Sequence, residues 1–289
     1  MRELVEFESE GATLRGWIDL PDGLGPYPAV VATGGYNGVK EFLLYHPYPE
    51  VFRAAGIAVL VYDHINCGES DGEPRNELDP FKQQRGYRDA ISYLWNRADI
   101  DETRIGIWGT SYAGGHVLEV AATDRRVKAV VSQAMTISGH GNSLRRNSPA
   151  GYVDLHRRIA LDRAARARGE APEYVQAFGD ESDTMKHQNA TPPEFKERWV
   201  NRTTLRSLEF YDYYEPAAFI ERIAPTPLLM IVPTGDTMTP AEDALSAYNR
   251  ALEPKEILLV PGEHYAVYEE HFEVTSTRAR DFFVRCLRP

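Results

Sequence analysis

Residues 104–123, RIGIWGTSYAGGHVLEVAAT, join a short apolar run, a serine between small residues and a helix-like segment. The run RIGIW predicts a buried strand, and residues 113–123 predict a helix. The turn between them is Gly109-Thr110-Ser111-Tyr112-Ala113. A nucleophilic serine presented where a strand passes directly into a helix needs small neighbours, because the turn is sharp and strained. We therefore predict that Ser111 is a nucleophile; the plainer alternative is a serine that only caps the helix.

A second serine matches the literal pattern GxSxG more closely, at Gly68-Glu69-Ser70-Asp71-Gly72. The preceding strand-like run ends near Asp63, and residues 73–76, EPRN, read as a loop. A nucleophile of this kind requires a strand directly before the serine and a helix directly after it. We therefore interpret Ser70 as part of an exposed turn.

Strand-like and helix-like segments alternate on both sides of Ser111. Two half-polar segments, 4–8 and 13–20, predict an antiparallel pair at a sheet edge. Strands alternating with helices predict an α/β fold, with about eight strands in a mostly parallel sheet and helices on both faces. The other expected strands are 26–35, 56–63, 104–108, 127–132, 227–233 and 256–261, and the expected helices are 48–55, 79–97, 113–123, 240–252 and 272–287.

Residues 140–215 interrupt this alternation. They contain a basic run, RAARAR at 163–168, but no clear strand. We expect a mostly helical cap (residues 136–215, the cap segment) inserted after the sixth strand, between the two parts of one core, 1–135 and 216–289. A few of the cap's aromatic side chains are expected to line an apolar pocket; the candidates are Tyr152, Phe178, Phe195, Trp199, Phe210, Tyr211, Tyr213 and Tyr214.

The composition restricts the partners. The 289 residues include 32 basic and 43 acidic side chains, for a net charge of −11. This argues against general affinity for nucleic acid or an anionic membrane, because both need a positive field. The two cysteines form no CxxC motif, which fits a reducing compartment. The N-terminal MRELVEFESEGATLRGW lacks the apolar run of a signal peptide, and no apolar run approaches the about 18 residues of a membrane span. We expect a cytoplasmic protein.

A serine nucleophile requires a base and a group that orients the base. On strand–turn–serine folds of this kind the chain order is serine, acid, histidine. Asp236 follows the seventh expected strand, and Asp243, inside the next helix, is a second candidate. His264 follows the last strand, whereas His271 is expected in or near the closing helix. We predict a triad of Ser111, Asp236 and His264. The alternative role of Asp236 is to cap the helix that is expected to begin near Pro240.

Acyl transfer also requires donors for a developing oxyanion. We expect the main-chain N–H of Tyr112, directly after the nucleophile, to be one donor. The second should come from the glycine-rich loop TGGYNG at 33–38, after the third strand. We predict that the N–H of Tyr36 is this second donor, with the N–H of Gly35 as the alternative. The loop could instead be an ordinary glycine-rich turn with no catalytic role.

Three further histidines, His46, His64 and His140, could reach a pocket beside Ser111, although a structural role fits each of them better. No HExxH motif or clustered metal-ligand spacing is present. We expect neither a metal nor a cofactor.

Four segments of the chain resemble a known group: GGYNGVKEFLLY, VYDHINCGESDGEPRNELDP, GTSYAGGHVLEVAATDRRVKAVVSQ and PTPLLMIVPTGDTMTP. They look like the α/β hydrolases related to dienelactone hydrolases, and most closely like the subgroup with fungal polyketide transferases. The resemblance implies an α/β-hydrolase fold, catalytic roles for Ser111, Asp236 and His264, and an oxyanion hole that uses the loop of Gly35 and Tyr36. The chain has Thr33-Gly34-Gly35 where many relatives have His-Gly, which leaves that loop's detailed geometry open. Dienelactone hydrolases proper use a cysteine nucleophile, so their substrate is not carried over.

These observations allow three functions. The first is hydrolysis of an ester or thioester through an acyl-serine, and the second is transfer of the same acyl group, of polyketide type, to an alcohol or amine. The third is a non-catalytic binding protein, which usually lacks a triad member. The expected partner is a small-molecule acyl substrate, free or bound to a carrier protein, and a homodimer is possible.

Overall fold

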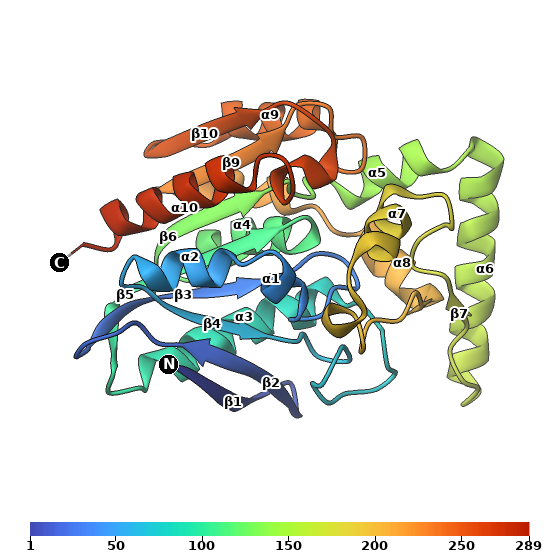
Figure 1. Ribbon diagram of the computed structural model, residues 1–289. Helices are drawn as coiled ribbons and strands as arrows, with labels where there is room; N and C mark the ends of the chain where they lie inside the picture. Colours follow the sequence, from blue (N-terminus) through green and yellow to red (C-terminus); the bar gives the residue numbers. More distant parts are fainter. Residues whose placement is uncertain (289) are drawn as a thin grey trace.

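The computed structural model describes residues 1–288, which form one large sheet flanked by helices (Figure 1). The sheet has eight strands in the order β1-β2-β4-β3-β5-β6-β9-β10. β1 pairs antiparallel with β2, β2 pairs antiparallel with β4, and all other neighbours are parallel. The predicted mostly parallel sheet with an antiparallel edge is therefore confirmed. The strands are β1 (Arg2–Ser9), β2 (Ala12–Asp19), β3 (Tyr27–Thr33), β4 (Ala58–Tyr62), β5 (Ile100–Thr110), β6 (Val127–Gln133), β9 (Leu228–Pro233) and β10 (Lys255–Val260).

Burial along the strands follows their place in the sheet. In β1, Val5, Phe7 and Ser9 are buried and their neighbours are exposed, as expected for an edge strand with one solvated face. In β4 every residue is buried, because helices or other strands cover both of its faces. The continuous apolar run that predicted β4 and the alternation that predicted β1 thus reflect different positions in one sheet.

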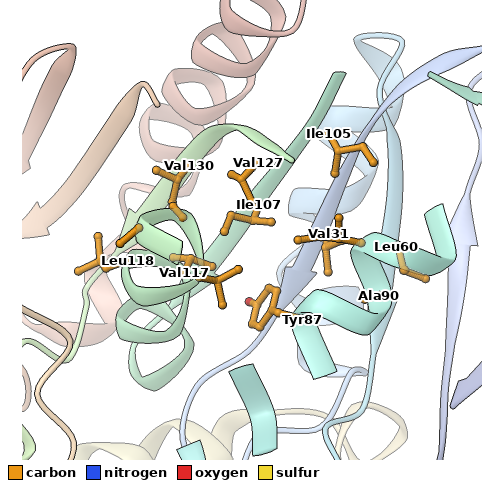
Figure 2. Close-up of a cluster of buried hydrophobic side chains, with 14 of the residues drawn as sticks. Val31, Leu60, Tyr87, Ala90, Ile105, Ile107, Val117, Leu118, Val127 and Val130 are labelled. Atoms are coloured by element: carbon orange, nitrogen blue, oxygen red, sulfur yellow. The ribbon is translucent and has the colours of Figure 1, made fainter. Parts of the chain in front are cut away.

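Helices cover both faces of the sheet. α3 (Pro80–Trp95), α4 (Tyr112–Thr123) and α9 (Ala241–Arg250) pack on one face, and α2 (Tyr48–Ala54) and α10 (Phe272–Cys286) pack on the other. Figure 2 shows the first interface, where Val31 and Ile107 from the strands meet Tyr87 of α3 and Val117 of α4. The adjacent strand residues point to the opposite core, as in Val30. No helix formed by residues 1–288 is long and apolar enough to cross a membrane.

After β6, residues 139–212 lie beyond the end of the sheet toward which β3 points (Figure 1). They contain α5 (Gly139–Arg146), α6 (Pro149–Ala167), α7 (Asp183–Ala190), α8 (Leu205–Asp212) and the short 3₁₀ helix η1 (Pro193–Phe195). A second 3₁₀ helix, η2 (Pro216–Arg222), packs against α4 on one face of the sheet. The expectation of no strand here was wrong in one detail. β7 (Tyr174–Val175) and β8 (Thr203–Thr204) form a small antiparallel ribbon, and two-residue strands are too short to leave an alternating pattern. The domain boundaries at 135/136 and 215/216 stay a prediction.

The basic run at 163–168 ends α6 and continues into its C-cap. Arg163 pairs with Glu209, Arg166 with Asp162, and Arg168 with Glu170. These ion pairs neutralise the run locally, which agrees with its interpretation as a solvated helix face.

Candidate active site

Ser111 occupies the predicted turn between β5 and α4. Its φ is +56°, a region that non-glycine residues rarely adopt and that costs free energy. A Cβ atom at Gly109 would lie 2.3 Å from the Ala113 carbonyl oxygen, and one at Gly114 would lie 2.8 Å from the Met135 Cβ. The small residues around Ser111 are therefore required by close packing of the turn, as the sequence indicated.

The structure brings the three predicted triad residues together. His264 is the first residue of η3 (His264–Val267), directly after β10 and its turn. Its Nε2 lies 3.1 Å from Ser111 Oγ, and its Nδ1 lies 2.6 Å from Asp236 Oδ2. With hydrogen on Nδ1, the imidazole donates to the carboxylate and leaves Nε2 free to accept the serine proton. This is the arrangement of a serine–histidine–acid triad.

Asp236 is buried and held by the turn that follows β9. Its Oδ1 accepts hydrogen bonds from the main-chain N–H groups of Met238 (2.8 Å) and Thr239 (2.9 Å). Burial alone would raise the pKa of the Asp236 carboxyl, but attraction to His264 and these hydrogen bonds hold that pKa below its ordinary value. The carboxylate therefore remains charged beside the imidazole. The alternative role of capping α9 is not observed, because the N-cap of α9 is Pro240.

The competing candidates lie elsewhere. Asp243, in the first turn of α9, forms an ion pair with Arg145 at 2.7 Å, and His271 precedes α10 with Glu270 at 3.7 Å. Ser70 is buried; its hydroxyl donates to the Asp63 carbonyl at 2.6 Å and accepts from the Arg15 N–H at 2.8 Å. The expectation that Ser70 lies in an exposed turn was wrong, because this turn folds onto the edge of β2.

The loop after β3 passes beside the nucleophile. A Cβ atom at Gly35 would lie 2.8 Å from Ser111 Cβ and 3.1 Å from Ser111 Oγ, so only glycine allows this approach. Among the hydrogen bonds of residues 1–288, none uses the N–H of Tyr36. The N–H of Tyr112 is at the first position of α4, where a helix supplies no acceptor. The N–H groups of Tyr36 and Tyr112 thus have no main-chain acceptor, and the oxyanion hole stays a prediction.

A buried charge cluster anchors the far end of this loop. The N–H of Lys40 donates to Asp63 Oδ1 at 2.7 Å, and its ammonium lies 2.9 Å from Asp63 Oδ2 and 2.6 Å from Glu69 Oε2. Burial alone would lower the pKa of Lys40, but these carboxylates and Glu41 hold it above the ordinary value. Arg198 of the cap segment also reaches Glu69, at 2.7 Å. Sequence reasoning missed this cluster, since polar residues 23 positions apart give no periodic signal.

The same loop contacts the cap segment directly. Asn37, at a φ of +56°, donates from Nδ2 to the Val200 carbonyl at 2.7 Å. This hydrogen bond links the residue next to Tyr36 to a segment far away in the sequence.

A cavity of about 100 Å³ opens beside Ser111 and His264. Three of the expected cap aromatics, Phe178, Trp199 and Tyr211, line it. The aromatic group is extended by Tyr36 and Tyr112, since Tyr36 packs edge-on against Tyr112 with centroids 5.2 Å apart and Tyr112 stacks on Tyr211 at 5.5 Å. The remaining lining residues are Gly35, Gly38, Phe42, Thr136, Arg146, Ala177, Thr184, Gln188, Leu208, Met238, Thr239, Tyr265 and Tyr268.

The other candidate histidines have structural contacts. His64 Nε2 lies 3.1 Å from Thr33 Oγ1, and His140 Nδ1 lies 3.2 Å from Asp212. His46 Nδ1 lies 3.1 Å from the Tyr268 carbonyl, its Nε2 lies 3.3 Å from His187 Nε2, and burial lowers its pKa to about 3. None of the three borders the cavity described above. Within residues 1–288, no three His, Cys, Asp or Glu side chains are grouped to hold a metal ion.

The sheet order, the strained serine turn and the Ser111–His264–Asp236 contacts together define an α/β hydrolase. The model of the X-Pro dipeptidyl-peptidase (S15) family matches residues 10–266, and the chain belongs to this family.

Named relatives point to hydrolysis or acyl transfer. The chain is 31% identical to a polyketide transferase, GrgF, of Penicillium sp, over 91% of this chain and 88% of the relative. It is 34% identical to a thiohydrolase, ApmlB, of Arthrinium phaeospermum, over 80% and 78% of the two chains. The crystal structure of the α/β hydrolase GrgF from Penicillium sp. sh18 superposes with a TM-score of 0.86, at 29% identity over 99% of both chains. These findings confirm the predicted fold and family resemblance, and they make the protein an enzyme of the hydrolase type, in the sense that includes acyl transfer.

Proposed function

We propose that the protein is a serine hydrolase that cleaves an ester or thioester through an acyl-Ser111 intermediate. The observation that carries the proposal is the continuous hydrogen-bonded line from Ser111 Oγ through His264 to Asp236. The strained backbone at Ser111 supports it further, because such strain is concentrated at functional sites.

In the first half-reaction, Ser111 Oγ attacks the carbonyl carbon while its proton passes to His264 Nε2. The carbonyl oxygen becomes an oxyanion, which accepts hydrogen bonds from the N–H groups of Tyr112 and of Tyr36 or Gly35. The intermediate collapses, the C–O or C–S bond breaks, and the leaving group takes the proton from His264. Asp236 holds the imidazole tautomer and stabilises the imidazolium that forms. In the second half-reaction, water attacks the acyl-Ser111 carbonyl carbon while His264 takes its proton. The acyl–oxygen bond to Ser111 breaks, the acid leaves, and Ser111 regains its proton from His264.

The second candidate is transfer of the acyl group to an alcohol or amine, which would replace water in the second half-reaction. Two observations favour it: relatives are called polyketide transferases, and side chains of the cap segment wall the cavity beside Ser111. A covered site limits competing attack by water. In either case the acyl donor is a small ester or a thioester, free or on a carrier protein.

The test is labelling with a fluorophosphonate probe, read by intact mass, on the native protein and on Ser111→Ala and Ser70→Ala. One adduct that disappears only in Ser111→Ala is expected, since Ser70 is buried in structural hydrogen bonds. An adduct lost in Ser70→Ala alone would reassign the nucleophile. If the native protein forms no adduct under conditions that label a control serine hydrolase, the serine-hydrolase function is refuted. The non-catalytic binding protein then becomes the favoured function. Product analysis with esters and thioesters, with and without an alcohol, then separates hydrolysis from transfer.

A further inference from the structure

Arg146, the last residue of α5, brings a positive charge to the cavity beside Ser111. Its Nη2 donates to the Met238 carbonyl at 3.0 Å, and the guanidinium carbon lies 5.4 Å from the ring centroid of Tyr211. Met238 is also held by Asp236 through its N–H. The guanidinium is therefore fixed relative to the triad by a carbonyl and by an aromatic face.

Arg146 is one of two arginines of the cap segment that have no acidic partner among residues 1–288. Most of those arginines lie within 4.0 Å of a carboxylate: Arg145, Arg157, Arg158, Arg163, Arg166, Arg168, Arg198 and Arg206. Within residues 1–288, Arg146 has none; Arg202, which also lacks one, packs over Tyr174. In a chain with 43 acidic and 32 basic side chains, an arginine that faces a cavity without an acid retains N–H donors for a ligand.

Tyr36 lines the same cavity and stays neutral. Its hydroxyl is buried and has no hydrogen-bond partner among residues 1–288. Burial raises the pKa of the Tyr36 phenol, and the neighbouring Thr203 side chain and the positive charge of Arg146 only partly oppose this rise. The phenol therefore keeps its proton, so it adds no negative charge that would oppose an anion beside Arg146.

We propose that Arg146 forms an anion subsite of this cavity, which selects acyl donors that carry a second, negatively charged oxygen group. The proposal rests on the proposed function. The anion is either a carboxylate on the acyl chain or a phosphate on the leaving group, because planar guanidinium recognises both groups with paired N–H donors. The otherwise aromatic cavity wall accommodates the hydrocarbon between the scissile carbonyl and the anion.

The first experiment compares kcat/KM for two matched p-nitrophenyl esters, the monoester of adipic acid and the hexanoate. The native protein should favour the adipate monoester, and Arg146→Gln should reduce that preference about 10-fold. This value lies between the small effect of an exposed ion pair and that of a charge-assisted hydrogen bond in a buried site, because Arg146 lines the cavity but is exposed to solvent.

The matched control is Arg145→Gln. It removes the same charge from the adjacent position, but Arg145 pairs with Asp243 rather than facing the cavity. In Arg145→Gln, the ratio of kcat/KM for the adipate monoester to that for the hexanoate should stay within about 2-fold of the native value. The reason is that charges at the rim of a site act mainly through long-range attraction. Equal losses in the two variants would mean that only general electrostatic attraction is involved, and would overturn the subsite.

A second pair of substrates distinguishes the source of the anion. Hexanoyl-coenzyme A carries phosphates on its leaving group, and hexanoyl-N-acetylcysteamine has the same thioester without them. If Arg146→Gln lowers kcat/KM for the coenzyme A ester alone and leaves the adipate preference intact, the anion belongs to the leaving group. If Arg146→Gln changes neither the ratio of kcat/KM between the two p-nitrophenyl esters nor that between the two thioesters, the proposed subsite is refuted.

A binding measurement separates this proposal from the proposed function. Titration of adipate and hexanoate into Ser111→Ala, and into Ser111→Ala with Arg146→Gln, needs no catalysis. Suppose that the coenzyme A phosphates have no effect in the previous experiment. Tighter binding of adipate than of hexanoate, lost in the Arg146→Gln variant, would then support the subsite. This holds even if the fluorophosphonate probe labels no nucleophile. Equal binding of the two acids, with a probe adduct on Ser111, would overturn the acyl-carboxylate subsite and leave the hydrolase function standing.

Discussion

Replacement of Ser111 by glycine and by alanine gives a direct measure of the strain stored in the turn. Both variants lose the hydroxyl and its hydrogen bond to His264, so that loss cancels in the comparison. They differ in the backbone, because the φ of +56° at Ser111 strains alanine but not glycine. We expect Ser111→Gly to be the more stable of two inactive proteins.

The size of the difference follows from three contributions. A non-glycine residue in such a region costs about 1–3 kcal/mol. Against this, glycine gives the unfolded chain more freedom, worth about 0.4–1 kcal/mol, and removes a half-buried Cβ, worth less than the about 0.8 kcal/mol of a fully buried methylene. The strain outweighs the other two contributions, and we expect Ser111→Gly to exceed Ser111→Ala by about 1 kcal/mol in free energy of unfolding. The corresponding rise in Tm is about 2–4 °C.

The assay is urea unfolding followed by circular dichroism, with scanning calorimetry for Tm. Ser92, in the ordinary helical backbone of α3, provides the matched control. There glycine should be less stable than alanine by about 1 kcal/mol, so the sign of the difference should reverse between positions 92 and 111. If glycine is the less stable variant at both positions, the turn at Ser111 stores no strain and the reasoning fails.

Three further outcomes are expected. Asp236→Asn should lower kcat for ester hydrolysis roughly 10⁴-fold, because the amide favours the wrong tautomer of His264; an unchanged kcat would refute this role. Gly35→Ala should cost at least about 10²-fold in kcat, the typical effect of losing one oxyanion donor, since its Cβ would meet Ser111 Cβ at 2.8 Å; normal turnover would show that the loop has room to move. Burial lowers the pKa of His46 from 6.5, its ordinary value, to about 3 in the fold. The unfolded chain therefore takes up a proton on His46 below pH 6.5 and the folded protein does not. The free energy of unfolding should be unaffected by His46 above pH 6.5 and should fall by about 1.4 kcal/mol per pH unit as the pH drops toward 3. Urea unfolding at pH 7 and pH 5 should show this loss in the native protein and a smaller one in His46→Gln; equal losses would refute it.

Local patterns predicted the elements well where packing reinforces them. The continuous apolar run of β4 and the alternation of β1 both produced strands at the expected places. The order of the strands was beyond such patterns: β4 lies between β2 and β3, and that arrangement depends on how the intervening helices cross the sheet. The ribbon of β7 and β8 was missed because its pairs are held by neighbouring tertiary structure rather than by a repeated pattern.

The site was predictable to the extent that chain order and loop position determine it. Ser111, Asp236 and His264 each follow a strand, and the carboxyl ends of parallel strands meet at one edge of the sheet. Contacts between distant polar residues gave no such signal. Lys40 and Asp63 are joined only because two loops fold together, and His46 meets His187 across 141 positions of sequence. Ser70 appeared exposed for the same reason, since nothing near it in the sequence indicates that the Arg15 main chain covers it.

The hydrogen bond from Asn37 to the Val200 carbonyl joins the cap segment to the loop proposed for the oxyanion hole. Tyr36, whose N–H is one of the proposed oxyanion donors, is the residue next to Asn37, so a shift of Val200 away from the sheet would pull on that donor as well as on the cavity wall. On the proposed function, a substrate that displaces this part of the cap segment would therefore also disturb oxyanion stabilisation. An acyl donor too bulky to let this contact re-form would be held at the nucleophile with an incomplete set of donors. Discrimination would then appear in the rate of acylation rather than in the strength of binding.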